Sequence, residues 1–484
     1  MIDAGIGANS ALDDNYVIDN SIQSNSVSTS NPPRFNRTNS GTGNRKTFTI
    51  SFWHKKGNSS HSNGISYTFI NSIRNESGKY PGLFLMDTRP VDTVKTVFTS
   101  YFCDEDANNV QESNTKTVAS YKDHSAWYHI VMAFDTTQSA AADRKAMYVN
   151  GVEQTFTQNQ DLPQHQQSSW NDDTLHSIGA YEYDLSNPTL GGYIAEVHNI
   201  DGLKLDASYF GEFDTASGIW KPKEYTGAYG TNGFRLQFKE SGTGQNASGL
   251  GADTSGNDHH FATVGFTAAN QATDTPTNNF CTWNPLWRYA TQPTMTDGAT
   301  KTLNSSSDWA GAKATFGLTN GKWYWEYKTL NSSSLNGIQT ANEAYTISGH
   351  AQAVKQTMVL YLAGEVEAYD FISVRDDTNV TFTYNAAHTF GIALDMDSST
   401  QTISFYQNGS LITNGGNINI DGLANNTVFP FSAVNNNTVT VNFGGYTSNS
   451  ISSAASDGNG YGTFEFAPPS GYYAICSKNL ARFG

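Results

Sequence analysis

Two distant segments of the chain share one pattern of apolar and polar positions. Phe134–Gly151 and Leu394–Gly409 each contain an apolar stretch, a polar turn that begins at an Asp, a second stretch and an Asn-Gly pair. Asn-Gly accepts the positive φ angles of a type I′ turn, so each segment predicts antiparallel strands joined by tight turns. The repeat predicts two antiparallel β-sandwiches in tandem, an architecture that favours a binding protein.

Alternation of apolar and polar residues continues on both sides of the first hairpin, and it predicts a first domain over residues 34–240. Asp206–Phe213 predicts one short helical turn within it, with Asp206 as the N-cap. The expected strands of this domain are Thr47–Trp53, Tyr67–Ile73, Gly82–Met86, Thr96–Phe102, Trp127–Phe134, Lys145–Val149, Gly192–Ile200 and Phe234–Phe238.

A second strand set predicts a second domain over residues 283–484. Ala341–Leu362 is helix-like, although Gln356–Tyr361 also fits a strand. Residues 241–282 are rich in Gly, Asn and Thr and predict a connecting loop. Residues 1–33 are polar and predict an extended N-terminal arm, with a disordered leader as the alternative. The strands expected in the second domain are Gly321–Tyr327, Ala368–Val374, Thr389–Leu394, Thr402–Tyr406, Val428–Val434 and Thr438–Phe443.

Composition supports an all-β fold and narrows the function. Of the 484 residues, 13% are aromatic and only 15% are charged, a balance typical of a protein with many strands and tight turns. The net charge of −16 argues against nucleic acid and against an anionic membrane surface, but it is compatible with a neutral polysaccharide. We find no apolar run long enough to insert into a membrane and no secretory signal pattern, so we expect synthesis and folding in a cytoplasm.

The three cysteines, Cys103, Cys281 and Cys476, show no metal-binding spacing. Cys281 and Cys476 bracket the second domain, and domain ends often lie close together. We therefore expect their Cα atoms within about 8 Å of each other. A bond between them is not required, because assembly in a reducing compartment keeps thiols free.

Several motifs carry a resemblance to bacteriophage virion proteins. The first region resembles a laminin-G/concanavalin-A-like domain of such proteins, and the second resembles a SPRY-like sandwich, except over Asn331–Val366. The first likeness lies in Gly43–Trp53, Trp127–Val131, Gly192–Asp214 and Trp220–Pro222, and the second in Gly321–Tyr327, Gly391–Asp395, Ser404–Gly409 and Val439–Gly444. Asp274–Leu286 and Pro468–Leu480 are also similar to segments of these phage proteins.

The resemblance implies a virion structural protein, made in the host cytoplasm, that serves as a tail-fibre or appendage subunit. It implies lectin-like sandwiches that contact a host surface glycan or receptor, and an arm that attaches to other virion proteins. By analogy with fibres, a homo-oligomer, and specifically a trimer, is expected. A capsid decoration or adaptor protein without a host ligand remains an alternative, and so does a glycan-degrading enzyme.

Glu365, Glu367 and Asp370 are weakly similar to the carboxylate signature of a concanavalin-like glycoside hydrolase family. Retaining hydrolysis needs two carboxyl groups about 5–5.5 Å apart. On a strand Glu365 and Glu367 share a face, while Asp370 falls on the opposite one unless a bulge intervenes. We therefore assign no catalytic residue and predict that the chain is not an enzyme; a solvated strand edge explains these acids.

Asp253, Asn257 and Asp258 form a candidate calcium site, because calcium binds carboxylate and carbonyl oxygens. The segment supplies about half of the six to eight oxygens that calcium takes. A Gly-containing turn with Asx hydrogen bonds is the alternative. Asp104–Asp106 is a similar acidic cluster. No cofactor is otherwise expected.

Trp170, Tyr181 and Tyr183 form a candidate glycan site. Their flat rings suit stacking on sugar rings, and polar neighbours suit sugar hydroxyls. An oligomer contact would also explain exposed aromatic residues. The polar neighbours are Asn171, Asp172, Asp173 and Asp184.

Overall fold

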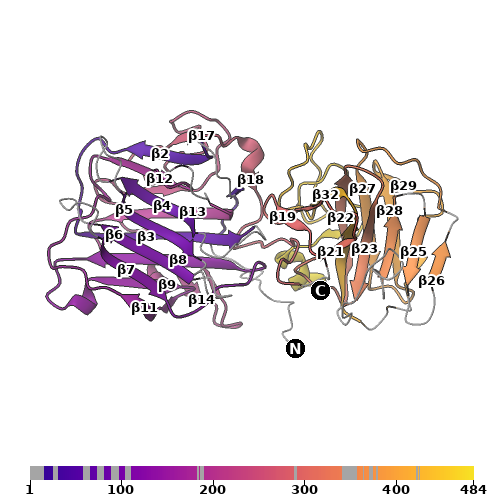
Figure 1. Ribbon diagram of the computed structural model, residues 1–484, viewed down its shortest axis with the longest axis horizontal. Helices are drawn as coiled ribbons and strands as arrows, with labels where there is room; N and C mark the ends of the chain where they lie inside the picture. The colour runs from indigo at the N-terminus through magenta and orange to yellow at the C-terminus, as the bar shows by residue number, and fades with distance from the viewer. Residues whose placement is uncertain are drawn as a thin grey trace.

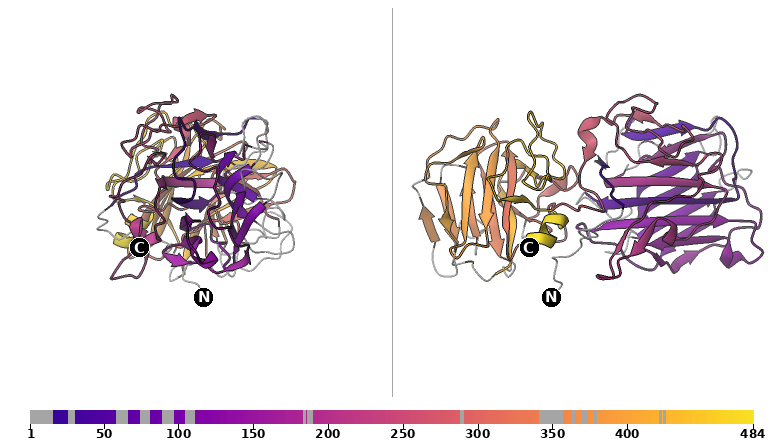
Figure 2. Two further views of the ribbon diagram at one scale, coloured as in Figure 1. Left: turned by 90° about the vertical axis from the view of Figure 1, so that its left-hand side faces the viewer. Right: turned by 180° about the vertical axis from the view of Figure 1, so that it is seen from behind.

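The computed structural model shows a nearly all-β protein whose two lobes lie side by side (Figure 1). In the part of the chain that it describes, the one α-helix is α1 (Ser477–Phe483), at the C-terminus beside the junction of the lobes (Figure 2). The structure describes residues 16–25, 31–57, 66–73, 81–88, 97–103, 111–182, 185, 190–287, 291–340, 357–362, 365–369, 374–377, 380–420, 423 and 426–484.

The first lobe is a sandwich of two antiparallel sheets. One sheet has the order β10 (Val152–Glu153), β9 (Lys145–Val149), β8 (Trp127–Asp135), β3 (Thr47–Lys56), β13 (Gly192–Asp201), β1 (Ser21–Ser24) and β18 (Gln271–Ala272), with β16 (Phe234–Leu236) also on β13. The other has the order β11 (Phe156–Asn159), β7 (Gln111–Thr117), β6 (Val97–Cys103), β5 (Pro81–Thr88), β4 (Ser66–Ile73), β12 (Leu175–Ile178), β2 (Arg34–Thr38) and β17 (Ala262–Val264).

Strand β3 shows how the first lobe builds two apolar layers. Phe48 and Phe52 point between the sheets, where they contact Phe134 and Phe69. Trp53 faces the opposite side and is also buried. That second face is covered by η2 (Ala207–Tyr209), β14 (Gly211–Phe213), β15 (Trp220–Pro222) and the residues around them.

The second lobe is also a two-sheet sandwich. One sheet has the order β19 (Thr294–Thr296), β20 (Lys301–Asn304), β32 (Asn437–Asn442), β22 (Lys322–Thr329), β27 (Phe390–Asp395), β28 (Thr402–Gln407) and β29 (Ser410–Leu411), with β30 (Ile418–Asn419) on β28 and β33 (Tyr473–Ala474) parallel to β22. The other has the order β21 (Ala310–Lys313), β31 (Val428–Val434), β23 (Ser334–Thr340), β24 (Thr357–Tyr361), β25 (Glu365–Tyr369) and β26 (Val374–Asp377).

Both predicted Asn-Gly hairpins are confirmed. Asn150 and Gly151 have φ of 47° and 78°, and Val149 pairs with Val152. Asn408 and Gly409 have φ of 49° and 74°, and the flanking residues pair as β28 and β29. Positive φ at both central residues is the signature of a type I′ turn.

The structure corrects two predicted elements of the second lobe. The helix expected over Ala341–Leu362 is wrong at its C-terminal part, because Thr357–Tyr361 forms β24 and pairs with β23 and β25. The strand alternative for this segment is the one observed; residues 341–356 lie outside the described residues. The expected strand Ala368–Val374 includes the end of β25 and the start of β26, which pair as two antiparallel strands.

The N-terminal and connecting segments are more structured than expected. Residues 21–24 of the predicted arm form β1, which is fully buried between β13 and β18. The predicted connecting loop contributes β17, η3 (Ala268–Asn270) and β18 to the first lobe. Both segments are recruited because their backbone groups complete sheet edges, a need that composition does not reveal.

A buried ion pair ties the first sandwich to the segment that leads into the second one. Lys55 Nζ on β3 lies 2.6 Å from Asp274 Oδ2, and both side chains are at most 1% exposed. The same ammonium donates to Asn279 Oδ1 at 2.7 Å and to the Phe280 carbonyl at 2.8 Å, so all three of its protons are used. Asp274 Oδ1 accepts from Trp127 Nε1 at 3.0 Å. Burial raises the pKa of Asp274, whereas these partners lower it.

The predicted proximity of Cys281 and Cys476 is confirmed. Phe280 bridges to Cys476, and the Cys281 amide donates to the Ile475 carbonyl at 3.0 Å. Both thiols are buried and free. The two ends of the second sandwich therefore meet at the junction, where α1 also begins.

Candidate binding site at the junction of the sandwiches

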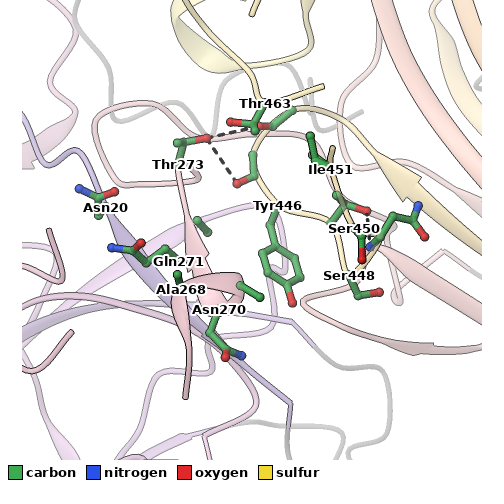
Figure 3. A pocket seen from close by; sticks show the side chains of 16 residues that line it. Asn20, Ala268, Asn270, Gln271, Thr273, Tyr446, Ser448, Ser450, Ile451 and Thr463 are labelled. Carbon is green, nitrogen blue, oxygen red and sulfur yellow. Dashed lines mark hydrogen bonds between the residues drawn. The ribbon is translucent and has the colours of Figure 1, made fainter. Parts of the chain in front are cut away.

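A cleft of about 610 Å³ lies between the two sandwiches. One wall is Ala268–Thr273 with Asn20, from the first sandwich, and the other is Gly444–Ile451 with Thr463, from the second (Figure 3). Binding sites often occur between domains, because the concave surface there is built from both sides.

Local interactions hold the first wall in place. Thr267 and Asn270 form a reciprocal capping box at η3. The side-chain amide of Gln271 donates to the carbonyls of Phe238 and Glu240 at 2.8 and 2.9 Å. Asn270 Nδ2 donates to the Gln23 carbonyl on β1. The amide groups of this wall are thus fixed to the first sandwich.

A backbone contact ties the two walls of the cleft together. The Thr273 amide donates to the Gly445 carbonyl at 2.9 Å. The Thr273 hydroxyl also reaches the carbonyls of Gly444 and Gly445, at 3.3 and 3.4 Å (Figure 3). Because this hydrogen bond joins the backbones of the two walls directly, it fixes the distance between the walls at this point.

The chemistry of the cleft is neutral and polar. Among the sixteen described residues that line it, none carries a charged side chain. Ten of the sixteen carry an amide or a hydroxyl group. One of them, Tyr446, has a partly buried ring in a T-shaped contact with Tyr193, with 6.1 Å between the ring centres. Burial, and to a smaller extent Asp297, raises the pKa of Tyr446, so its hydroxyl stays neutral. Such groups can hydrogen-bond an uncharged hydroxylated ligand.

The predicted glycan site around Trp170 is wrong at its central residue. Trp170 is fully buried, its Nε1 donates to Asn199 Oδ1 at 2.9 Å, and its ring meets His176 at 4.6 Å. A ring enclosed on all sides cannot stack on a sugar. Tyr181 is partly exposed, and Tyr183 lies outside the described residues.

The polar neighbours of Trp170 explain the error. Asp172 is buried and pairs with Arg45, with 3.2 Å between Oδ2 and Nη1. Asn171 is buried as well, and its amide donates to the Asn44 carbonyl. These side chains point inward to satisfy one another instead of facing a ligand.

The predicted calcium site is a turn held by Asx hydrogen bonds. Asp253 accepts from the backbone amides of Arg235, Ser255 and His259 at 2.8–2.9 Å, which occupies both oxygens. Asn257 donates its amide to the carbonyls of Gly230 and Gly233, whereas the Asp258 side chain is 89% exposed. In the described segments no group of three or more His, Cys, Asp or Glu is arranged for a metal ion.

The remaining acidic candidates are only partly covered by the structure. Glu365 and Glu367 both lie on β25, whose backbone pairs with β24 and β26. Asp370 and the cluster Asp104–Asp106 lie outside the described residues. None of the helices in the described part of the chain has the length and apolar character needed to cross a bilayer.

No family model matches the sequence, and no curated protein matches it. Among solved structures, the chain is similar to a native heptameric SAP-like pentraxin from Limulus polyphemus, with 11% identity, coverage of 39% of this chain and 78% of that chain, and a TM-score of 0.29. It is also similar to the TRIM65 PSpry domain, with 12% identity, coverage of 34% of this chain and 89% of that chain, and a TM-score of 0.27. A third similar structure is the SPRY domain of human HERC1, with 14% identity, coverage of 29% of this chain and 87% of that chain, and a TM-score of 0.23.

Pentraxin and SPRY domains have concanavalin A/laminin-G-like sandwich folds, the fold class expected from the sequence. The assignment of this chain to that class rests on its own strand order and antiparallel pairing.

Sequence reasoning did not find the cleft. Its walls come from Ala268–Thr273 and Gly444–Ile451, which are far apart in the chain and show neither alternation nor a charged motif. The expected meeting of Cys281 and Cys476 located only one wall, because Ala268–Thr273 closely precedes Cys281 whereas Gly444–Ile451 lies well upstream of Cys476.

Proposed function

We propose that this chain is a structural subunit of a bacteriophage virion, a tail fibre or related appendage, and that it binds neutral glycan on the host surface. The phage-like motifs of both sandwiches support the first part. The neutral cleft at the junction supports the second, and it is the observation that carries the proposal. In a homo-oligomer, by analogy a trimer, several copies would bind at once, and their weak contacts together would give a higher overall affinity.

Binding without cleavage fits the cleft better than catalysis does. Glycoside hydrolysis needs an acid and a base or nucleophile at the bond that breaks. The lining offers amides, hydroxyls and one neutral tyrosine, which can orient sugar hydroxyls but cannot supply that acid–base pair at neutral pH. We therefore propose that any glycan leaves the cleft unchanged.

The test is binding of the purified chain to an array of neutral and acidic bacterial oligosaccharides. The parent should bind neutral members, and Ala269→Lys should weaken that binding about tenfold by placing a charge in the cleft. Ala386→Lys, at an exposed alanine of the second sandwich, is the matched control and should bind like the parent. Absence of binding to any neutral glycan would favour a decoration or adaptor protein, and release of reducing sugar would favour an enzyme.

A further inference from the structure

The first sandwich carries a second hollow, of about 520 Å³, whose chemistry differs from that of the cleft. It lies between the tip of the β9–β10 hairpin and the segment that covers the same sheet. Its described lining includes Tyr148 and Glu153 from the hairpin and Phe213, Trp220 and Lys223 from the covering segment.

Trp220 forms a rigid floor for this hollow. A Cβ on Gly151 would lie 2.4 Å from its Cε3 atom, and one on Gly211 would lie 2.4 Å from its Cζ2 atom, so only glycine fits on either side. Trp220 Nε1 donates to His129 Nδ1 at 3.1 Å. The His129 ring in turn stacks on Trp53, with 4.6 Å between the ring centres.

Phe213 presents an apolar face at the hollow. Its side chain is 51% exposed although its ring makes a T-shaped contact with Trp220, with 4.9 Å between the ring centres. The turn after it is fixed, because Asp214 accepts from the backbone amides of Ala216 and Ser217. A fixed, half-exposed ring over an aromatic floor is the surface on which the CH face of a sugar stacks.

The charged side chains around Phe213 indicate which class of sugar the hollow favours. The lining has three carboxylates, Glu153, Asp206 and Glu212, and one ammonium, that of Lys223. A second ammonium, that of Lys221, lies outside the lining with its Nζ 3.8 Å from Glu212 Oε1, so Glu153 and Asp206 are the carboxylates without a lysine partner in the described ion pairs. Lys223 is engaged with the Ser208 carbonyl at 3.1 Å. Burial, and then Glu153 and Asp206, raise the pKa of Tyr148, as expected beside negative charge. The hollow therefore disfavours acidic sugars and favours a protonated amine.

We propose that this hollow binds an amino sugar, with its ring on Phe213 and its ammonium among the three carboxylates. The ammonium also gains from the nearby aromatic face. The inference deepens the proposed function, since it rests on the chain binding host glycan, and it assigns a second contact on the first sandwich.

The probe is the hexamer of glucosamine, with the hexamers of N-acetylglucosamine and galacturonate as neutral and acidic counterparts, measured by calorimetry at 0.15 M salt. The parent should bind the glucosamine hexamer at least about tenfold more tightly than either counterpart. Phe213→Ala should bind the glucosamine hexamer about tenfold more weakly than the parent, and Phe213→Trp should bind it like the parent. Leu411→Ala, at a leucine of the second sandwich that is 52% exposed, is the matched control.

Glu153→Lys is a second variant, needed in case Phe213→Ala disturbs the packing of Trp220. Glu153 is exposed and lies outside the core. It should weaken binding of the glucosamine hexamer while the thermal midpoint stays unchanged. Equal affinity for a hexalysine peptide would mean attraction by charge alone and would overturn the proposal. The proposal would also be overturned if Phe213→Ala bound the glucosamine hexamer as tightly as the parent, or if the parent did not bind it.

The two proposals fail separately. Neutral array binding that responds to Ala269→Lys, together with no glucosamine binding, would overturn the hollow and leave the cleft standing. Glucosamine binding that responds to Phe213→Ala, together with no neutral binding, would overturn the cleft and leave the hollow standing.

Discussion

Replacing Lys55 by Met tests whether the buried ion pair holds the junction. Methionine keeps much of the length and volume of the lysine stem but removes the ammonium. Asp274 would keep the Trp127 Nε1 donor and the Phe280 amide on Oδ1, whereas Oδ2 would lose its partner. Asn279 Oδ1 and the Phe280 carbonyl would lose a donor as well.

The expected loss is large because every group left behind is buried. Removing one partner of a buried ion pair typically costs about 3–5 kcal/mol, a substantial share of the 5–15 kcal/mol that stabilises a typical protein. Replacing Asp274 by Asn in the same chain removes the unpaired charge and keeps an oxygen for Trp127. The double variant should then lose only about 1–3 kcal/mol, because Asn279 Oδ1 and the Phe280 carbonyl have each lost the hydrogen bond from Lys55.

Urea unfolding at pH 7, followed by tryptophan fluorescence, measures both variants against the parent. The order of stability should be parent, then Lys55→Met/Asp274→Asn, then Lys55→Met. Small-angle scattering should show a larger maximum dimension for Lys55→Met, because the sandwiches lose their fixed orientation. The reasoning is refuted if Lys55→Met unfolds within 1 kcal/mol of the parent, or if the double variant is no more stable than the single one.

Two further predictions concern titration and thiol chemistry. Burial lowers the pKa of His129 to about 3 and that of His176 to about 4, so the folded state stays neutral while the unfolded state gains protons below pH 6.5. The free energy of unfolding should therefore fall between pH 7 and pH 5, by about 2 kcal/mol for each histidine. Urea unfolding of His176→Gln should show a smaller fall over this pH range than the parent does. A free energy of unfolding that does not change with pH in the parent would contradict this expectation. Burial raises the pKa of Cys281 to about 11 and that of Cys476 to about 12. Iodoacetamide at pH 8 should leave both thiols unmodified until urea is added, as read by mass spectrometry.

The hairpins were predictable because their signals are local. Asn150-Gly151 and Asn408-Gly409 set the turns, and the apolar alternation on either side sets the strands. The N-cap at Asp206 was predictable for the same reason, since its side chain accepts from the Ser208 amide two residues later. Each of these features depends only on residues close in the chain.

Polar strands were missed because tertiary partners define them. Gln111–Thr117 and Ser334–Thr340 show little apolar alternation, yet each pairs with a strand on both sides. Ser21–Ser24 is equally polar but completes a sheet between two neighbours. Such strands gain stability from backbone hydrogen bonds with distant residues, and a single sequence contains no record of those pairings.

The polar residues of the N-terminal segment show why burial itself is hard to predict here. Tyr16, part of the predicted extended arm, donates to Glu196 Oε1 at 2.6 Å, and Arg235 Nε donates to the same oxygen at 2.7 Å. Burial alone would raise the pKa of Glu196, but His198, Arg235 and Tyr16 together lower it to about 2. In a chain with few charges, a charged or polar side chain is therefore weak evidence for the surface. Lys55 and Asp274 at the junction and Glu196 and Arg235 in the first sandwich are all buried, although each carries a charge.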